Sequence, residues 1–261
     1  MQSILSRRAR QINTFDPVRR VHPLNQGCVA WWLALPHSQG GGTWYDLLGS
    51  YPASFVAMSN ANNGWRSTTR PGGYGHVLFD GTAGYVQCRS SAILSGKPNW
   101  VIAAWVITTV ASTSISRSIY CERGAAGNDI LKMDSVTGGQ NGFGITYRND
   151  AGNIIQVFSA DVINDGLWHR VVIVFTGTGF LLFRDGLANN SLAWSNSNTF
   201  TDAVQARIGT DAGDPSAFFQ GSIDGVKLWT GNPLALASPA AFADLDYFQS
   251  RRGDPDTLNY L

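Results

Sequence analysis

The sequence predicts an all-β chain, and three features of its 261 residues carry that prediction. One Glu and three Lys stand beside 17 Asp and 16 Arg, so two of the residues that favour helices are scarce. Glycine contributes 29 residues, and Gly, Asp, Asn, Ser and Thr together are typical of turns. From about residue 28 onward, short apolar or alternating runs follow one another, as the strands of a β protein do. Helix should therefore be scarce.

Residues 1–26 form a basic arm that differs from the rest of the chain. Its cations are Arg7, Arg8, Arg10, Arg19 and Arg20. With Asp16 they give a local charge of +4, whereas the whole chain carries +1, so the remainder carries −3. The arm has little apolar periodicity and two prolines, which predicts an extended segment. We expect it to fasten the protein into a larger assembly through an acidic protein surface; nucleic acid is a less favoured partner because Phe15 is the arm's only aromatic residue.

The first half of the body predicts strands divided by turn residues. The run VAWWLAL is followed by ASFVAM, HVLFDG, YVQC and the long apolar run WVIAAWVITT. A stretch at residues 62–75, NNGWRSTTRPGGYG, has no strand pattern and predicts a long loop. The runs RSIYCE and ILKMD continue the series of strands.

The second half continues in the same way and ends in a helix. The runs GFGITYR, IIQVFSA, HRVVIVFT, GFLLFRDG, ARIGT and GSIDGVKLW bring the predicted strands to about a dozen, with separators such as NDAGN and TGTG. Ser238 as N-cap and Pro239 at the first helical position, followed by AAFADLDYFQ, predict one short helix. We take residues 27–250 as one domain and residues 251–261 as a tail.

Five segments, taken in order, resemble one known family. They are GCVAWWLAL with WYDLLGSYPASFVAM, then HVLFDGTAGYVQC, NWVIAAWVITT, DGLWHRVVIVFTGTGFLLFRDG, and ARIGT with FFQGSIDGVKLWTGNPLALASPAAFADL. Together they resemble the laminin-G-like, or concanavalin A-like, jelly-roll family, and their order and spacing hold from about residue 27 to residue 250. The resemblance implies a two-sheet antiparallel jelly-roll sandwich.

The resemblance also assigns roles around the Trp-His pair. It implies that Trp168 plugs the sandwich core, that His169 follows on a strand, and that Asp185 and Gly186 turn a hairpin. It places Arg184 on the exposed face of that strand, where the family prefers an apolar residue. We interpret His169 as structural, because its own motif supplies neither a nucleophile nor a carboxylate partner. We expect Trp105 to lie in the core with Trp168.

The sequence does not favour catalysis. Relatives that hydrolyse glycosides need two carboxylates flanking one bond, commonly a pair of Glu, and Glu122 is the single Glu of this chain. We therefore predict that the protein is not an enzyme. A glycoside hydrolase or lyase built on aspartates is the remaining catalytic alternative.

Metal binding has a few candidate ligands. Many members of the resembled family hold Ca²⁺ at the rim of the sandwich, and the candidates here are Asn128 with Asp129, and Asp211 with Asp214. The alternative is that these residues fill turns without any ion. No cofactor is required by the sequence, and Ca²⁺ is the ion to test. Cys28, Cys88 and Cys121 lack metal-ligand spacing, and we expect them to be reduced and buried.

Glycan recognition has its candidates in the predicted loop 62–75. Sugar-binding sites use aromatic faces together with polar donors, and this loop offers Trp65, Arg66, Arg70 and Tyr74. The alternative is that Trp65 and Tyr74 fold back to cover one end of the sandwich. The Arg252, Gly253 and Asp254 tripeptide is of a kind that arises by chance too often to carry a function, and the sequon at Asn189 means little where no signal peptide is visible.

These observations predict a non-catalytic binding and assembly protein. The basic arm, the glycine-rich lectin-like body and the lack of a hydrophobic leader or membrane span favour a bacteriophage virion component, such as a capsid decoration or fibre-associated protein. It would be made in the host cytoplasm and carried on the virion surface, with other virion proteins, surface glycans and further copies of itself as partners. The alternative is a free, extracellular carbohydrate-binding lectin module.

Overall fold

A computed structural model gives the structure of most of the chain. The residues described are 26–34, 41–59, 62–67, 75–89, 93–110, 117–124, 130–137, 140–194, 200–201, 203–211, 217–231 and 238–251. The basic arm, Arg70, Tyr74, Asn128, Asp129, Asp214 and the tripeptide at 252–254 lie outside these residues. Within the described part, no helix is both long and apolar enough to cross a membrane.

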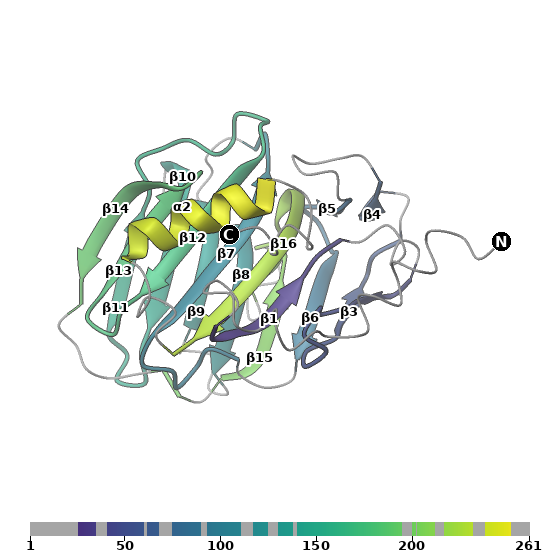
Figure 1. The fold of residues 1–261 in the computed structure, drawn as a ribbon. Helices are drawn as coiled ribbons and strands as arrows, with labels where there is room; N and C mark the ends of the chain where they lie inside the picture. The colour runs from purple at the N-terminus through teal and green to yellow at the C-terminus, as the bar shows by residue number, and fades with distance from the viewer. Residues whose placement is uncertain are drawn as a thin grey trace.

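Two antiparallel sheets stack face to face (Figure 1). Sheet A runs in the order β14 (Leu187–Ala193), β13 (Gly179–Arg184), β12 (His169–Phe175), β7 (Trp100–Ile107), β16 (Gln220–Thr230), β5 (His76–Asp80) and β4 (Gly64–Arg66), and β1 (Cys28–Trp32) also pairs with β16. Sheet B runs in the order β11 (Ile154–Phe158), β10 (Gln140–Arg148), β9 (Ile130–Thr137), β8 (Arg117–Gly124), β15 (Ala203–Ile208), β6 (Tyr85–Arg89), β3 (Ala53–Val56) and β2 (Thr43–Trp44). The predicted all-β sandwich is confirmed.

The main core fills the space between the sheets. Alternate residues of β12 point into it, with Val171, Ile173 and Phe175 among its members. The Phe175 ring stacks on Phe180 at a centroid distance of 4.8 Å, and Tyr147 of sheet B stacks on Phe175 at 5.7 Å. These contacts tie the two sheets together, because the three rings come from both layers.

A second, smaller core lies on the outer face of sheet A, under helix α2 (Pro239–Arg251). Figure 1 shows this helix lying across the strands of sheet A. The helix begins as predicted, since the Ser238 hydroxyl oxygen accepts a hydrogen bond from the Ala241 backbone N–H at 3.3 Å. Phe242 then packs against Trp229 of β16 at a centroid distance of 5.2 Å. Sheet A is therefore apolar on both of its faces in this region.

Every predicted run forms a strand, and three further strands were not predicted. β2 and β4 have two and three residues, too few for a periodic signal. β14 has the sequence LANNSLA, and its residues are exposed or half-buried at the edge of sheet A, so it shows no apolar alternation. Both kinds of strand depend on neighbours that the local sequence does not indicate.

One predicted core residue is misplaced. Trp168 is half-buried and packs edge-on against His76, with ring centroids 5.4 Å apart. It stands just before the first residue of β12, where the sheet ends, and so it caps the end of the sandwich instead of filling the core. Trp105, in contrast, is 1% exposed, as predicted.

Candidate functional site

Glu122 is fixed as a structural residue. Its side chain is fully buried, and its carboxylate accepts backbone hydrogen bonds from Ile93 at 3.0 Å, Leu94 at 2.7 Å and Ser95 at 2.9 Å. The Tyr120 hydroxyl donates a fourth bond at 2.7 Å. Burial raises the pKa of this carboxyl, against the opposing effect of the four donors. Because its oxygens are occupied by the loop at 93–95, the side chain holds that loop to the sheet.

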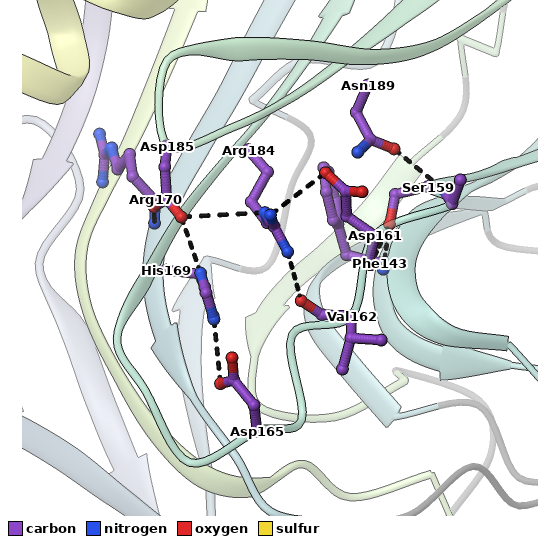
Figure 2. Close-up of polar contacts among 11 residues, drawn as sticks. Phe143, Ser159, Asp161, Val162, Asp165, His169, Arg170, Arg184, Asp185 and Asn189 are labelled. Atoms are coloured by element: carbon purple, nitrogen blue, oxygen red, sulfur yellow. Dashed lines mark hydrogen bonds and ion pairs between the residues drawn. The ribbon is translucent and has the colours of Figure 1, made fainter.

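His169 lies between two carboxylates at one end of sheet A (Figure 2). Its Nδ1 is 2.7 Å from Asp185 Oδ2, and its Nε2 is 3.0 Å from Asp165 Oδ1. Asp185 and Gly186 have positive φ angles of 53° and 84°, the conformation of a two-residue hairpin turn, as predicted. The expectation that His169 has no carboxylate partner in its own motif is wrong, since both partners belong to that motif. They are separated from it by four and sixteen residues, and only the fold brings Asp185 back.

The network continues through Arg184 to the loop between β11 and β12. Arg184 Nη2 is 3.3 Å from Asp161 and its Nη1 donates to the Val162 carbonyl at 2.7 Å, while its Nε is 3.8 Å from Asp185. Figure 2 shows Arg184 bridging the turn and the loop in this way. Arg184 is thus partly exposed and ion-paired at the sheet surface, in line with its predicted place on the exposed face.

The His169 network orients side chains and, among the described residues, brings no hydroxyl or thiol nucleophile to the imidazole. Burial alone would lower the pKa of His169, but the hydrogen bonds and charges of Asp185 and Asp165 together raise it. Within the described part of the chain, its ring nitrogens contact carboxylates and no hydroxyl or thiol. A triad for acyl transfer needs such a nucleophile beside the imidazole, so the interpretation of His169 as structural stands.

Trp65 is a core residue and not an exposed platform. It lies on β4, is 6% exposed, and donates from its indole N–H to the Gly41 carbonyl at 2.9 Å. Its ring packs against Phe55 at 4.9 Å and against Trp44 at 5.9 Å. Trp65 is therefore buried within the main core, and its ring offers no exposed face. Arg66 is half-buried, and its Nη1 donates to the Trp65 carbonyl at 2.8 Å.

Asp211 is engaged by two cations. Its carboxylate is 2.6 Å from Arg123 Nη1 and 3.2 Å from Lys132 Nζ, and the residue is 5% exposed. These ion pairs engage its carboxylate, and Asp214, the second residue of the predicted calcium pair, lies outside the described residues. No group of three or more His, Cys, Asp or Glu side chains is placed to hold a metal ion in the described ranges. The three cysteines are free, with Cys88 and Cys121 buried and Cys28 half-buried.

A row of mostly polar side chains, interrupted by the buried Cys121, crosses the outer face of sheet B, and sequence reasoning missed it. On β15 and β6, the residues that point into the core are Ala206, Ile208, Val86 and Cys88, so the intervening residues point outward. The strand registers then place eight outward residues side by side across all eight strands: Thr43, Ser54, Gln87, Arg207, Cys121, Lys132, Thr146 and Gln156. We call this set the polar row.

Arg207 of the polar row is oriented by a ring and an amide. Its guanidinium lies over the Tyr85 ring at 4.5 Å from the centroid, and its Nε donates to Gln87 Oε1 at 3.0 Å. Gln87 in turn donates from Nε2 to the Ala206 carbonyl at 3.0 Å. Arg207, Gln87 and Tyr85 are half-buried and Ser54 is exposed, so a ligand could reach this part of the row. A planar cation, amides and hydroxyls on a rigid sheet are groups that fix a polar ligand.

Local sequence could indicate only part of this surface. The alternation in YVQC and ARI predicts that Tyr85, Gln87 and Arg207 point away from the core. It does not predict that Arg207 and Gln87 are neighbours, because 120 residues separate them in the chain. The pairing of β6 with β15 makes the contact.

The sequence and the fold were compared with those of known proteins. Residues 80–235 match the family described as the concanavalin A-like lectin/glucanases superfamily. No curated protein is a significant match to the sequence.

Solved structures share the fold at low identity. The binding domain of Paraclostridial Mosquitocidal Protein 1 is 10% identical, with a TM-score of 0.65 over 89% of this chain and 56% of that one. Domain 4 of an extracellular arabinanase from Geobacillus stearothermophilus, solved with arabinotriose, is 14% identical, with a TM-score of 0.61 over 84% of this chain and 97% of that one. The receptor binding domain of botulinum neurotoxin D is 9% identical, with a TM-score of 0.61 over 87% and 54%. The chain spans about half the length of the two toxin domains.

Proposed function

The chain belongs to the concanavalin A-like lectin/glucanases superfamily, and we propose that it is a non-catalytic carbohydrate-binding protein whose ligand lies on the polar row of sheet B. The observation that carries the proposal is the fixed Arg207 guanidinium, held by Tyr85 and Gln87 on a half-buried polar face. Sugars present hydroxyls in a fixed geometry, and rigid amide, hydroxyl and guanidinium groups match them with directed hydrogen bonds. A domain of the same fold has been solved with arabinotriose, which supports this ligand class.

Two observations support a binding role over catalysis. Glu122, the single Glu, is enclosed by four donors, so it is not available to protonate a glycosidic oxygen. His169 is held between Asp165 and Asp185 and has an orienting role. Binding is proposed to need no metal, because the Asp211 carboxylate already pairs with Arg123 and Lys132.

A glycan screen tests the proposal directly. Full-length protein should bind at least one glycan on an array, with binding unchanged by a chelator of divalent ions. Arg207→Ala should weaken that binding by about tenfold or more, the loss expected for a charge-assisted hydrogen bond. Lys97→Ala is the matched control, since Lys97 is an exposed cation in the loop 93–99 and outside the polar row. Binding to no glycan, or equal binding by both variants, would refute the proposed site.

The basic arm motivates a second proposal at a coarser level. We propose that residues 1–26 anchor the protein in a phage virion, with the sandwich displayed outward. The supporting observation is the local charge of +4 on a chain of +1, which favours an acidic partner surface. Arms that become ordered on binding recover the entropy of ordering through contact area.

The mass of the protein in solution tests the anchoring proposal. Light scattering should detect multimers of the full chain, and deletion of residues 1–26 should convert them to monomers without a large change in melting temperature. Addition of Ca²⁺ should not alter either result. Monomers under every condition would favour a free carbohydrate-binding lectin module, and unfolding after the deletion would make the arm part of the sandwich.

A further inference from the structure

We propose that the ligand is an acidic glycan whose carboxylate pairs with Arg207, an inference that rests on the carbohydrate-binding function proposed above. It specifies the chemical class of the glycan at the same site. Three features of the described residues support the inference. The Arg207 guanidinium has a fixed orientation, no carboxylate among those residues balances its charge, and it covers one face of the Tyr85 ring.

The orientation of Arg207 is set before any ligand arrives. The Tyr85 ring supports the plane of the guanidinium at 4.5 Å, and Gln87 Oε1 holds its Nε at 3.0 Å. Gln87 is itself fixed by its bond to the Ala206 carbonyl. A side chain that is already ordered loses less rotamer entropy on binding, so this arginine is suited to hold an anionic group in a defined geometry.

The charge of Arg207 is not balanced by a carboxylate among the described residues, and this separates it from its neighbours. Along the same face, Arg123 and Lys132 share Asp211, and Lys132 is also 3.6 Å from Asp134. The contacts of Arg207 are instead a neutral amide and an aromatic ring. A half-buried cation without a counter-ion favours a ligand that brings one.

The ring of Tyr85 argues against a neutral sugar as the main ligand. Neutral sugars gain affinity by stacking their apolar face on an aromatic ring. Here the guanidinium already covers one face of Tyr85. The group presented to a ligand is therefore the cation, and its fork of N–H groups matches the two oxygens of a carboxylate. The exposed hydroxyl of Ser54, which pairs across the sheet with Gln87, can accept from or donate to a sugar hydroxyl.

Matched glycan pairs test the inference. The probes are polygalacturonate, alginate and hyaluronan, each compared with its own methyl ester, together with dextran sulfate and dextran. Calorimetry should show that full-length protein binds at least one carboxylate glycan about tenfold or more tightly than the ester of the same chain. Binding should weaken at higher salt, because a charge pair is screened.

Two variants distinguish the effect of the bidentate geometry of the Arg207 guanidinium from the effect of its positive charge. Arg207→Lys keeps the positive charge and loses the bidentate geometry, so it should lose most of the preference for acid over ester. Arg207→Gln should abolish the preference, whereas Lys97→Gln, which removes one charge elsewhere, should keep it.

The outcomes distinguish this inference from the function on which it rests. A neutral glycan bound as tightly as the acids would refute the acidic class and leave the carbohydrate-binding function intact. Dextran sulfate bound as tightly as the carboxylates would refute recognition of a carboxylate in favour of general anion attraction. Binding to none of these probes but to a neutral glycan on an array would refute only the acidic class, whereas binding to no glycan at all would refute both.

Discussion

The outer faces of the two sheets differ in what covers them. On sheet A, the registers place Phe183, Val172, Ala103, Lys227 and Trp31 side by side. Of these residues, Phe183, Val172 and Ala103 belong to the core beneath α2. On sheet B, the corresponding face carries the polar row, which is exposed at Ser54 and Gln156. A sandwich requires one apolar face on each sheet, so a second apolar face has to be covered by a helix.

The two faces also treat charge differently. Under α2, Asp246 is fully buried between Arg170 Nε at 2.7 Å and Lys227 Nζ at 3.2 Å. Burial lowers the pKa of Lys227, and Asp246 only partly opposes that effect. On sheet B, Asp211 pairs with Arg123 and Lys132, whose side chains are 21% and 11% exposed. The charges of the first cluster are stabilised only by other buried side chains, whereas water also solvates the cations of the second.

Removal of Asp246 should produce the largest effect. Asp246→Ala leaves Arg170 and Lys227 buried without their shared anion, and we expect a loss of about 3–5 kcal/mol in the free energy of unfolding. Urea unfolding measures this loss. Asp211→Ala is the matched variant on sheet B and should cost clearly less, because Arg123 can turn to solvent. Equal losses would remove the energetic difference between the two faces.

Two tryptophans at sheet A separate a buried position from an end position. Trp105→Ala should cost about 3–5 kcal/mol, because Trp105 is almost fully enclosed. Trp168→Ala should cost less than that, since Trp168 is half-buried at the end of the sandwich. Chemical denaturation of both variants gives the comparison. A larger loss at Trp168 would restore the core position that the family resemblance implied.

Substitution of Glu122 tests both the stability of the main core and the absence of catalysis. In Glu122→Gln, an amide N–H₂ group replaces one acceptor oxygen and faces a backbone donor, so we expect a loss of about 1–3 kcal/mol. Thermal melting measures the loss. Assays of polysaccharide turnover should show no activity in either protein. Turnover by the wild-type protein that disappears in the variant would instead support a hydrolase or lyase.

The smallest expected effect is a pH dependence at the end of sheet A. Because the pKa of His169 is raised in the folded protein, its charged form stabilises the fold below the unfolded pKa of 6.5. That contribution should fade as the pH rises through the higher, folded pKa. Melting temperatures of the wild type and His169→Gln, followed from about pH 5 to pH 9, should therefore converge on the alkaline side. A difference in melting temperature that stays constant across this pH range would contradict a stabilising charge on His169.

The sequence alone determined the local elements of this protein. Alternation and apolar runs placed thirteen of the strands, and Ser238 with Pro239 placed the start of the helix, because both signals act over a few residues. The order of five segments was enough to indicate the jelly-roll family before any contact was known. The roles of the arm, of Arg70 and Tyr74, and of Asn128, Asp129 and Asp214 stay predictions, since these residues lie outside the described part.

Only the tertiary structure decided the candidate site. Alternation assigns a residue to a face of its strand, but it does not say which strand lies beside it. The Arg207 guanidinium is therefore fixed only by the pairing of β15 with β6, and His169 contacts Asp185 only because β12 pairs with β13. The same limit explains Trp168, which was expected in the core and is half-buried at the end of the sandwich, and Trp65, whose burial the sequence left open. Burial depends on where a strand ends and on what packs over it, and those contacts come from residues far away in the chain.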